Sequence, residues 1–102
     1  MAMSEDAPLL KRISAHELGG PAPADPTVCS ETVIALMSTV AGEGMRMTSL
    51  NLDVTAAVLG ETDVSISARV DKRARSIVFV SAEARSDAQL IFTAQGLFVR
   101  SA

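Results

Sequence analysis

The sequence predicts a single α+β domain in which one apolar helix is wrapped by a curved antiparallel sheet. Two observations indicate this class. The stretch from Asp25 to Gly44 has the periodicity of a helix, and the four segments after it follow the period of two that is typical of strands. The connections between those segments are short, as in an antiparallel meander. With 102 residues, the chain is expected to be one domain over its full length.

The helix is predicted from its start signals and from one apolar stripe. Asp25 is a favourable N-cap, and Pro26 fits the first helical position, where its missing N–H costs nothing. Gly42 and Gly44 are natural stops. Apolar residues between these signals recur at helical spacing and are expected to be buried: Val33, Leu36, Met37 and Val40 up to Gly44, widened by Ile34 and Ala41.

The strand after the helix is predicted over Met47–Val58, and the next one over the alternating residues from Asp63 to Asp71. The basic run Lys72–Arg75 is expected at a hairpin tip. Ile77–Ala84 and Gln89–Val99 are apolar on both faces, which is typical of more central strands. In the predicted strand Met47–Val58, the residues expected to face inward are Leu50, Leu52, Val54, Ala56 and Val58.

Before the helix the pattern is less regular. Ala7–Leu18 is expected to give a short strand, with Leu9, Ile13 and Leu18 facing inward. Residues 1–6 are expected to be disordered, and the segment that begins at Gly19 is rich in proline and glycine, as in a connector. These elements alone fit both a hotdog fold and a cystatin-like fold.

Composition limits the functions that we expect. The net charge of −3, three phenylalanines and no tryptophan or tyrosine argue against nucleic-acid binding. The single cysteine, Cys29, cannot form an internal disulfide, and no segment approaches the length of a membrane span. The N-terminus lacks the features of a secretory signal. We therefore expect a cytoplasmic protein with no nucleic-acid or membrane partner and no metal site.

Three segments carry a resemblance to a known superfamily. They are TSLNLDVTAAV (Thr48–Val58), ISARVDKRARSIVFVSAEARSD (Ile66–Asp87) and LIFTAQGLFV (Leu90–Val99). Together they resemble the hotdog-fold acyl-CoA thioesterases of the phenylacetate and 4-hydroxybenzoyl-CoA type. The resemblance implies a homodimer or a dimer of dimers, in which the strand after the helix pairs with its twofold mate. It also implies that acyl-CoA lies between subunits, with coenzyme A as part of the substrate and no separate cofactor.

The helix departs from the pattern of that superfamily. Similar enzymes open the helix with His-Gly-Gly and carry an Asp or Glu about eight residues after the histidine. In this chain Cys29, Ser30 and Glu31 take the first positions, and Ser38 takes the place of the carboxylate. A serine hydroxyl does not accept a proton near neutral pH, so Glu31 becomes the candidate water-activating base. An ordinary acid in the first helical turn is the alternative interpretation of Glu31.

The other candidate site residues have similar pairs of interpretations. Ser38 and Thr39 would hydrogen-bond the ligand or bond back to their own helix, and the N–H groups of Ser30 and Glu31 would polarise the thioester carbonyl. Asn51, with Asp53, would line the acyl pocket or be a solvated edge residue. The residues expected to hold the phosphates of coenzyme A, unless they form a solvated tip, are Lys72, Arg73 and Arg75.

The sequence thus leaves two main hypotheses for function. The first is a thioesterase that hydrolyses a small or medium acyl-CoA. The second is a non-catalytic hotdog protein that binds an acyl or aromatic ligand, or a protein partner. A cystatin-like interaction domain is a third and more distant hypothesis.

Overall fold

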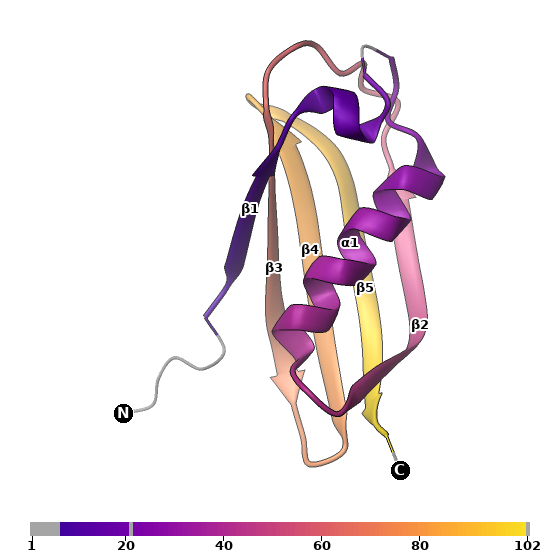
Figure 1. Cartoon of the computed structure of the whole chain (residues 1–102), viewed down its shortest axis with the longest axis vertical. Coiled ribbons are helices and arrows are strands. Elements are labelled where there is room, and N and C mark those ends of the chain that lie inside the picture. The colour runs from indigo at the N-terminus through magenta and orange to yellow at the C-terminus, as the bar shows by residue number, and fades with distance from the viewer. Residues whose placement is uncertain (1–6, 21, 102) are drawn as a thin grey trace.

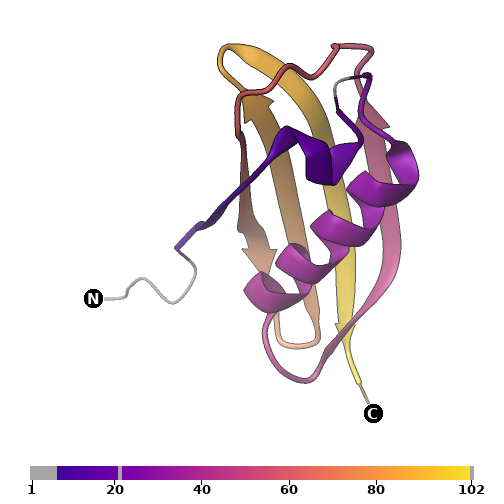
Figure 2. The ribbon, with the colours of Figure 1, turned by 45° about the horizontal axis from the view of Figure 1, so that its top comes forward.

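The computed structural model describes residues 7–20 and 22–101, so the predicted disorder of residues 1–6 lies outside the described residues. A five-stranded antiparallel sheet carries one long helix on one of its faces (Figures 1 and 2). The strands lie in the order β1-β3-β4-β5-β2. The elements are β1 (Leu9–Ile13), the 3₁₀ helix η1 (Ala15–Leu18), α1 (Pro26–Ala41), β2 (Met45–Val54), β3 (Val64–Arg73), β4 (Ile77–Ser86) and β5 (Gln89–Arg100).

Helix α1 begins where the sequence predicts it. The Asp25 carboxylate accepts a hydrogen bond from the Thr27 N–H at 2.9 Å, and Pro26 is the first helical residue. Of the two predicted stops, Gly42 ends the helix: it has a φ of 102°, and its N–H still donates to the Ser38 carbonyl. The predicted extension of the helical stretch to Gly44 is wrong. A short turn of residues 42–44 separates α1 from β2, and Gly44 belongs to that turn.

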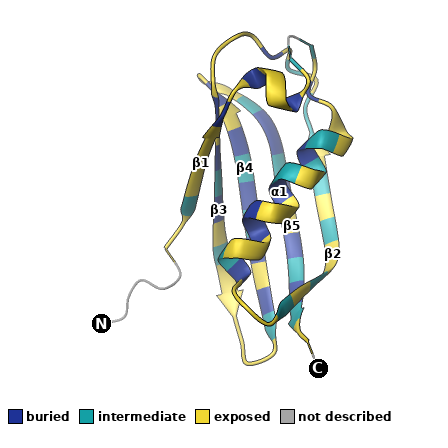
Figure 3. Cartoon of the chain, viewed as in Figure 1, coloured by how far each residue is buried: buried dark blue, intermediate teal, exposed yellow. Residues whose placement is uncertain are grey.

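The core lies between α1 and the inner face of the sheet (Figure 3). The helix contributes a buried stripe that matches the predicted one at Val33, Leu36, Met37 and Ala41 and adds Cys29. Ile34, expected to widen the stripe, remains 36% exposed because it lies beyond the edge of the contact with the sheet. Of the aromatic residues, Phe92 and Phe98 of β5 are fully buried beneath the helix.

Strand β2 is shorter than predicted at its C-terminal end. The predicted inward residues Leu50, Leu52 and Val54 do pack against the core. The chain then leaves the sheet at Thr55, whose hydroxyl donates to the Leu90 carbonyl at 2.8 Å and accepts from the N–H two residues later. As a result, Ala56 is exposed, and Val58, expected to face inward, is 61% exposed.

The first predicted strand, Ala7–Leu18, divides into two elements. Only Leu9–Ile13 forms a strand, which pairs with β3. The chain then turns at Ser14, where the Glu17 carboxylate accepts the Ser14 N–H at 3.2 Å and starts η1. Ile13 and Leu18 are nevertheless buried, as expected, because both elements pack on the same core.

Gly96 of β5 allows α1 to approach the sheet closely. A Cβ atom at this position would lie 3.1 Å from Met37 Cε and 3.2 Å from Met47 Cε. We therefore expect Gly96→Val to lower the free energy of unfolding by about 2–3 kcal/mol through overpacking, as measured by urea denaturation. Gly60→Val is the matched control, because an added Cβ at Gly60 meets nothing within 4 Å. Equal unfolding midpoints for the two variants would contradict this account.

Candidate functional site

The candidate residues of α1 divide into two kinds. The Ser30 hydroxyl donates to the Thr27 carbonyl at 2.8 Å, and the Thr39 hydroxyl donates to the Ala35 carbonyl at 3.1 Å. These two hydroxyls thus bond back to their own helix. Glu31 and Ser38 are both exposed, and within the described residues their side chains make no hydrogen bond or ion pair. Because they are seven residues apart, they lie two turns apart on nearly the same face of the helix.

The start of α1 at Pro26 determines how Ser30 and Glu31 are interpreted. In a helix that begins at Pro26, their N–H groups are donors of the regular i to i−4 hydrogen bonds, so they lie one turn inside the helix. The interpretation of Glu31 as an acid in the first turn is also wrong, since the first turn of α1 contains no acidic residue. The carboxylate is therefore an exposed group on the second turn, beyond most of the influence of the helix dipole.

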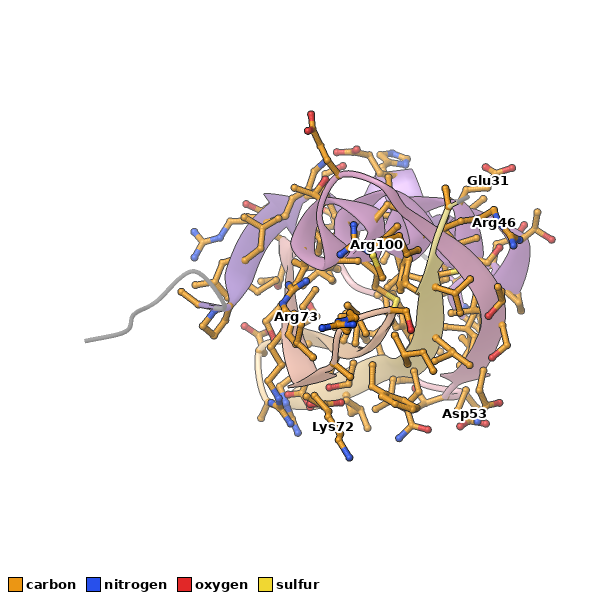
Figure 4. The ribbon with its side chains drawn as sticks, turned by 90° about the horizontal axis from the view of Figure 1, so that it is seen from below. Glu31, Arg46, Asp53, Lys72, Arg73 and Arg100 are labelled. Atoms are coloured by element: carbon orange, nitrogen blue, oxygen red, sulfur yellow. The ribbon has the colours of Figure 1, made fainter. Side chains whose placement is uncertain are left out.

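The basic side chains of the β3–β4 hairpin do not point in one direction, as the view from below shows for Lys72 and Arg73 (Figure 4). Arg73 points toward the helix, where its guanidinium donates to the Ala41 carbonyl at 3.0 Å and to the Val40 carbonyl at 3.3 Å. Lys72 points away from the helix. Neighbouring strand residues alternate in face, and the register shift between Val70 and Lys72 decides that Lys72 takes the outer face and Arg73 the inner one. Arg73 therefore stabilises the C-terminal end of α1.

A single chain does not bring the predicted site residues together. The hairpin lies at the C-terminal end of α1, and Glu31 lies ten residues before Ala41, a separation of about 15 Å along the helix. Asn51 and Asp53 are exposed on the outer face of β2, opposite the inner face that packs on α1. The predicted residues thus form three separate groups, on the helix, on the outer face of β2 and at the hairpin.

Sequence reasoning missed two arginines. Arg100 reaches the hairpin, where its guanidinium donates to the Arg75 carbonyl at 3.4 Å. Arg46 is exposed on the outer face near the start of β2, paired in register with Val99. The alternation of β2 could have placed Arg46 on that face, but the contact of Arg100 depends on how the hairpin folds.

Strand β2 leaves apolar surface next to the helix. It is an edge of the sheet, and its inner face is only half-buried although it packs against the core. An edge strand also presents unpaired backbone N–H and C=O groups. The half-buried inner residues are Met45, Met47, Leu50, Leu52 and Val54.

Cys29 lies in the first half of α1 and is fully buried. Burial raises the pKa of its thiol from 9.0 to about 11, and the negative charge of Asp25 adds to this effect. The thiol therefore adds to stability below pH 9, and this contribution is lost as the pH rises toward 11.

We expect Cys29 of the folded protein to react with an aromatic disulfide reagent at pH 8 at least about 100-fold more slowly than in urea, because both the thiolate fraction and access are reduced. A stopped assay that follows release of the coloured thiolate measures both rates. Equal rates in the folded and unfolded protein would contradict the burial of Cys29.

The described residues contain neither a cluster of metal ligands nor a membrane-spanning helix. No group of three or more His, Cys, Asp or Glu side chains lies close enough to hold a metal ion within that part of the chain. Among the described helices, none has the length and apolar character needed to cross a membrane.

Comparison with known proteins identifies the architecture. No protein-family model matches the chain, and no curated protein sequence matches it. Solved structures do match. AziG of S. sahachiroi superposes with a TM-score of 0.79 at 17% identity, over 98% of this chain and 87% of the other. The thioesterase HI1161 of Haemophilus influenzae gives a TM-score of 0.77 at 13% identity, over 97% of this chain and 74% of the other.

The PaaI protein from the phenylacetic acid degradation operon of E. coli gives a TM-score of 0.76 at 11% identity, over 96% of this chain and 74% of the other. At these identities the similarity establishes the fold and not the activity. The chain therefore has the hotdog fold, one long helix packed on a five-stranded antiparallel sheet, and the solved structures similar to it include thioesterases.

Proposed function

We propose that the protein is a homodimeric thioesterase that hydrolyses a small or medium acyl-CoA near the N-terminal half of α1. The observation that supports this function best is the position of Glu31 on a hotdog scaffold. Glu31 is the one carboxylate within α1, all of whose residues are described, and it is exposed and unpaired there. A carboxylate in that state is free to accept a proton from water.

The reaction requires few groups. The oxygen of a water molecule attacks the thioester carbonyl carbon while the Glu31 carboxylate accepts a proton from that water. The tetrahedral intermediate then collapses, the carbon–sulfur bond breaks, and the departing thiolate of coenzyme A takes up a proton. In this proposal the hydroxyl of Ser38, which is exposed two turns after Glu31, hydrogen-bonds the acyl group. Lys72 and Arg75 remain the candidates for holding the phosphates of coenzyme A.

A second copy of the chain is needed to combine these groups. We propose that β2 pairs with β2 of the second copy about a twofold axis, which covers the open edge. The strand direction then reverses, so the hairpin end of the second copy comes level with the N-terminal end of α1. Glu31 of one copy then lies near the hairpin of the other copy, although the two groups lie at opposite ends of α1 within one chain.

The sequence of β2 favours one register for this pairing. When Arg46 lies opposite Asp53 of the second copy, Met47 lies opposite its Leu52. The first pair joins opposite charges on the outer face, and the second joins apolar side chains on the inner face. Both pairs occur twice in a twofold dimer, so the strand is complementary to itself.

Release of free thiol from a panel of acyl-CoA esters tests the proposed function. Turnover of at least one short or medium acyl-CoA above the rate in buffer is the expected result. The absence of turnover across the panel would overturn the thioesterase proposal.

A non-catalytic ligand-binding protein is the second candidate. Its support is that no histidine or other side chain within the described residues forms a hydrogen bond or ion pair with the Glu31 carboxylate. If this candidate is right, coenzyme A or an acyl-CoA raises the melting temperature while no thiol is released.

A further inference from the structure

Four apolar side chains form a contiguous block on the outer face of the sheet, which we call the outer block. It consists of Ile77 and Phe79 on β4 and of Leu97 and Val99 on β5. Phe79 pairs with Leu97, and Ile77 pairs with Val99, in uninterrupted antiparallel register. Their neighbours Val78 and Phe98 are buried on the opposite face, so the outer block faces away from α1. Phe79 remains 44% exposed although β4 is the central strand.

The outer block has a basic border at the hairpin. Lys72 of β3 lies opposite Phe79 in register, and Arg75 is exposed in the turn just before Ile77. Figure 4 shows Lys72 projecting from the outer face. The nearest acid, Asp71, is already paired: its Oδ1 accepts from Arg69 Nε at 3.2 Å and from the Ser81 hydroxyl at 3.0 Å. The border therefore carries a net positive charge in a protein whose net charge is −3.

A hollow beside Phe79 offers room for a side chain of a partner. Its volume is about 390 Å³, and its walls are both polar and apolar. The residues around it are Asp71, Lys72, Phe79, Val80, Gln95 and Gly96. An exposed aromatic ring beside such a hollow and next to a cation is the combination typical of the centre of a protein interface.

We propose that the outer block docks an acidic amphipathic helix of a partner protein. Charge complementarity with Lys72 and Arg75 selects an acidic partner, and the four apolar side chains match the apolar stripe of a helix. The block is two strands wide, or about 10 Å, which is close to the diameter of one helix. A second copy stacked twofold on this block would bring like charges together, so it is not the occupant that the charges favour.

A synthetic peptide of leucine and glutamate with helical periodicity is the probe. Its binding to the full chain is measured by fluorescence anisotropy, next to an analogue in which lysine replaces glutamate. We expect the acidic peptide to bind and the basic one not to bind, with weaker binding at high salt. Phe79→Ser and Lys72→Glu are each expected to weaken binding at least about tenfold. Lys11→Glu on β1 makes the same change of charge at a distant strand and should leave binding unchanged.

Further measurements separate this proposal from its alternatives. Phe79→Ser should keep the circular dichroism spectrum and any thioesterase turnover of the wild type, because Phe79 is an exposed side chain outside the proposed active site. Equal binding of both peptides, or unchanged binding by Phe79→Ser, would overturn the proposal. It would also be overturned if the block instead bound phosphatidylglycerol vesicles, or if Phe79→Ser abolished self-association in sedimentation.

Discussion

Replacing Glu31 with glutamine is expected to lower kcat for acyl-CoA hydrolysis by at least about 100-fold, while KM changes by less than about threefold. Glutamine keeps the size and hydrogen-bonding capacity of the side chain but cannot accept the proton of the attacking water. The loss should therefore fall on the chemical step and not on substrate binding. Steady-state thiol release from the best acyl-CoA of the panel measures both constants.

The environment of Glu31 makes this variant informative. The carboxylate is exposed and makes no hydrogen bond or ion pair within the described residues, so the variant should unfold at the wild-type urea concentration. Glu43→Gln is the matched control, because Glu43 is an exposed glutamate just beyond the C-terminal end of α1. Turnover by Glu31→Gln equal to that of the control would show that another group activates water, even if the protein is a thioesterase.

The local signals in the sequence were sufficient for the helix and for the strands along the chain, but not for the order of the strands in the sheet. The predicted meander holds for β3, β4 and β5 and is wrong for β2, which pairs with β5, while β1 pairs with β3. Asp25 and Pro26 define the start of α1 because a cap depends on adjacent residues. Alternation gives the inward residues from Leu50 to Val54 of β2 and from Val64 to Ala68 of β3. It does not give the inward side chains of β2 before the register shift that follows Met47. The strand ends were harder, since the exit of β2 depends on a hydrogen bond from Thr55 to the distant Leu90 carbonyl.

The candidate site was predictable only in part. Asp71, Lys72 and Arg73 are all polar, so alternation cannot reveal the register shift between Val70 and Lys72 that turns Lys72 outward and Arg73 toward the helix. Lys72, Arg73 and Arg75 were therefore predicted as one basic cluster. Local sequence patterns also cannot predict whether Glu31 and the hairpin belong to one site. The two lie at opposite ends of α1 and would meet only in an assembly of two chains.

Reversing one charge at the edge of β2 is expected to break the proposed dimer. In the favoured register Arg46 faces Asp53 of the second copy, so Arg46→Asp replaces two attractions with two repulsions across the twofold axis. We expect the dissociation constant to rise by at least about 30-fold, as measured by analytical ultracentrifugation. Turnover should fall in parallel, because the proposed site combines α1 of one copy with the hairpin of the other.

The double variant Arg46→Asp, Asp53→Arg tests the pairing itself. It restores opposite charges at the same two positions, so it should recover the dimer and the turnover that the single variant loses. Arg85→Asp is a suitable control, since Arg85 is an exposed arginine on β4, away from this edge, and its guanidinium pairs with Glu83 within the chain at 2.7 Å. If the single variant dissociates but the double variant does not recover, the strands pair in a shifted register. If Arg46→Asp remains a dimer, β2 does not form the dimer interface. The proposed site, which needs the hairpin of the second copy in that arrangement, would then be wrong.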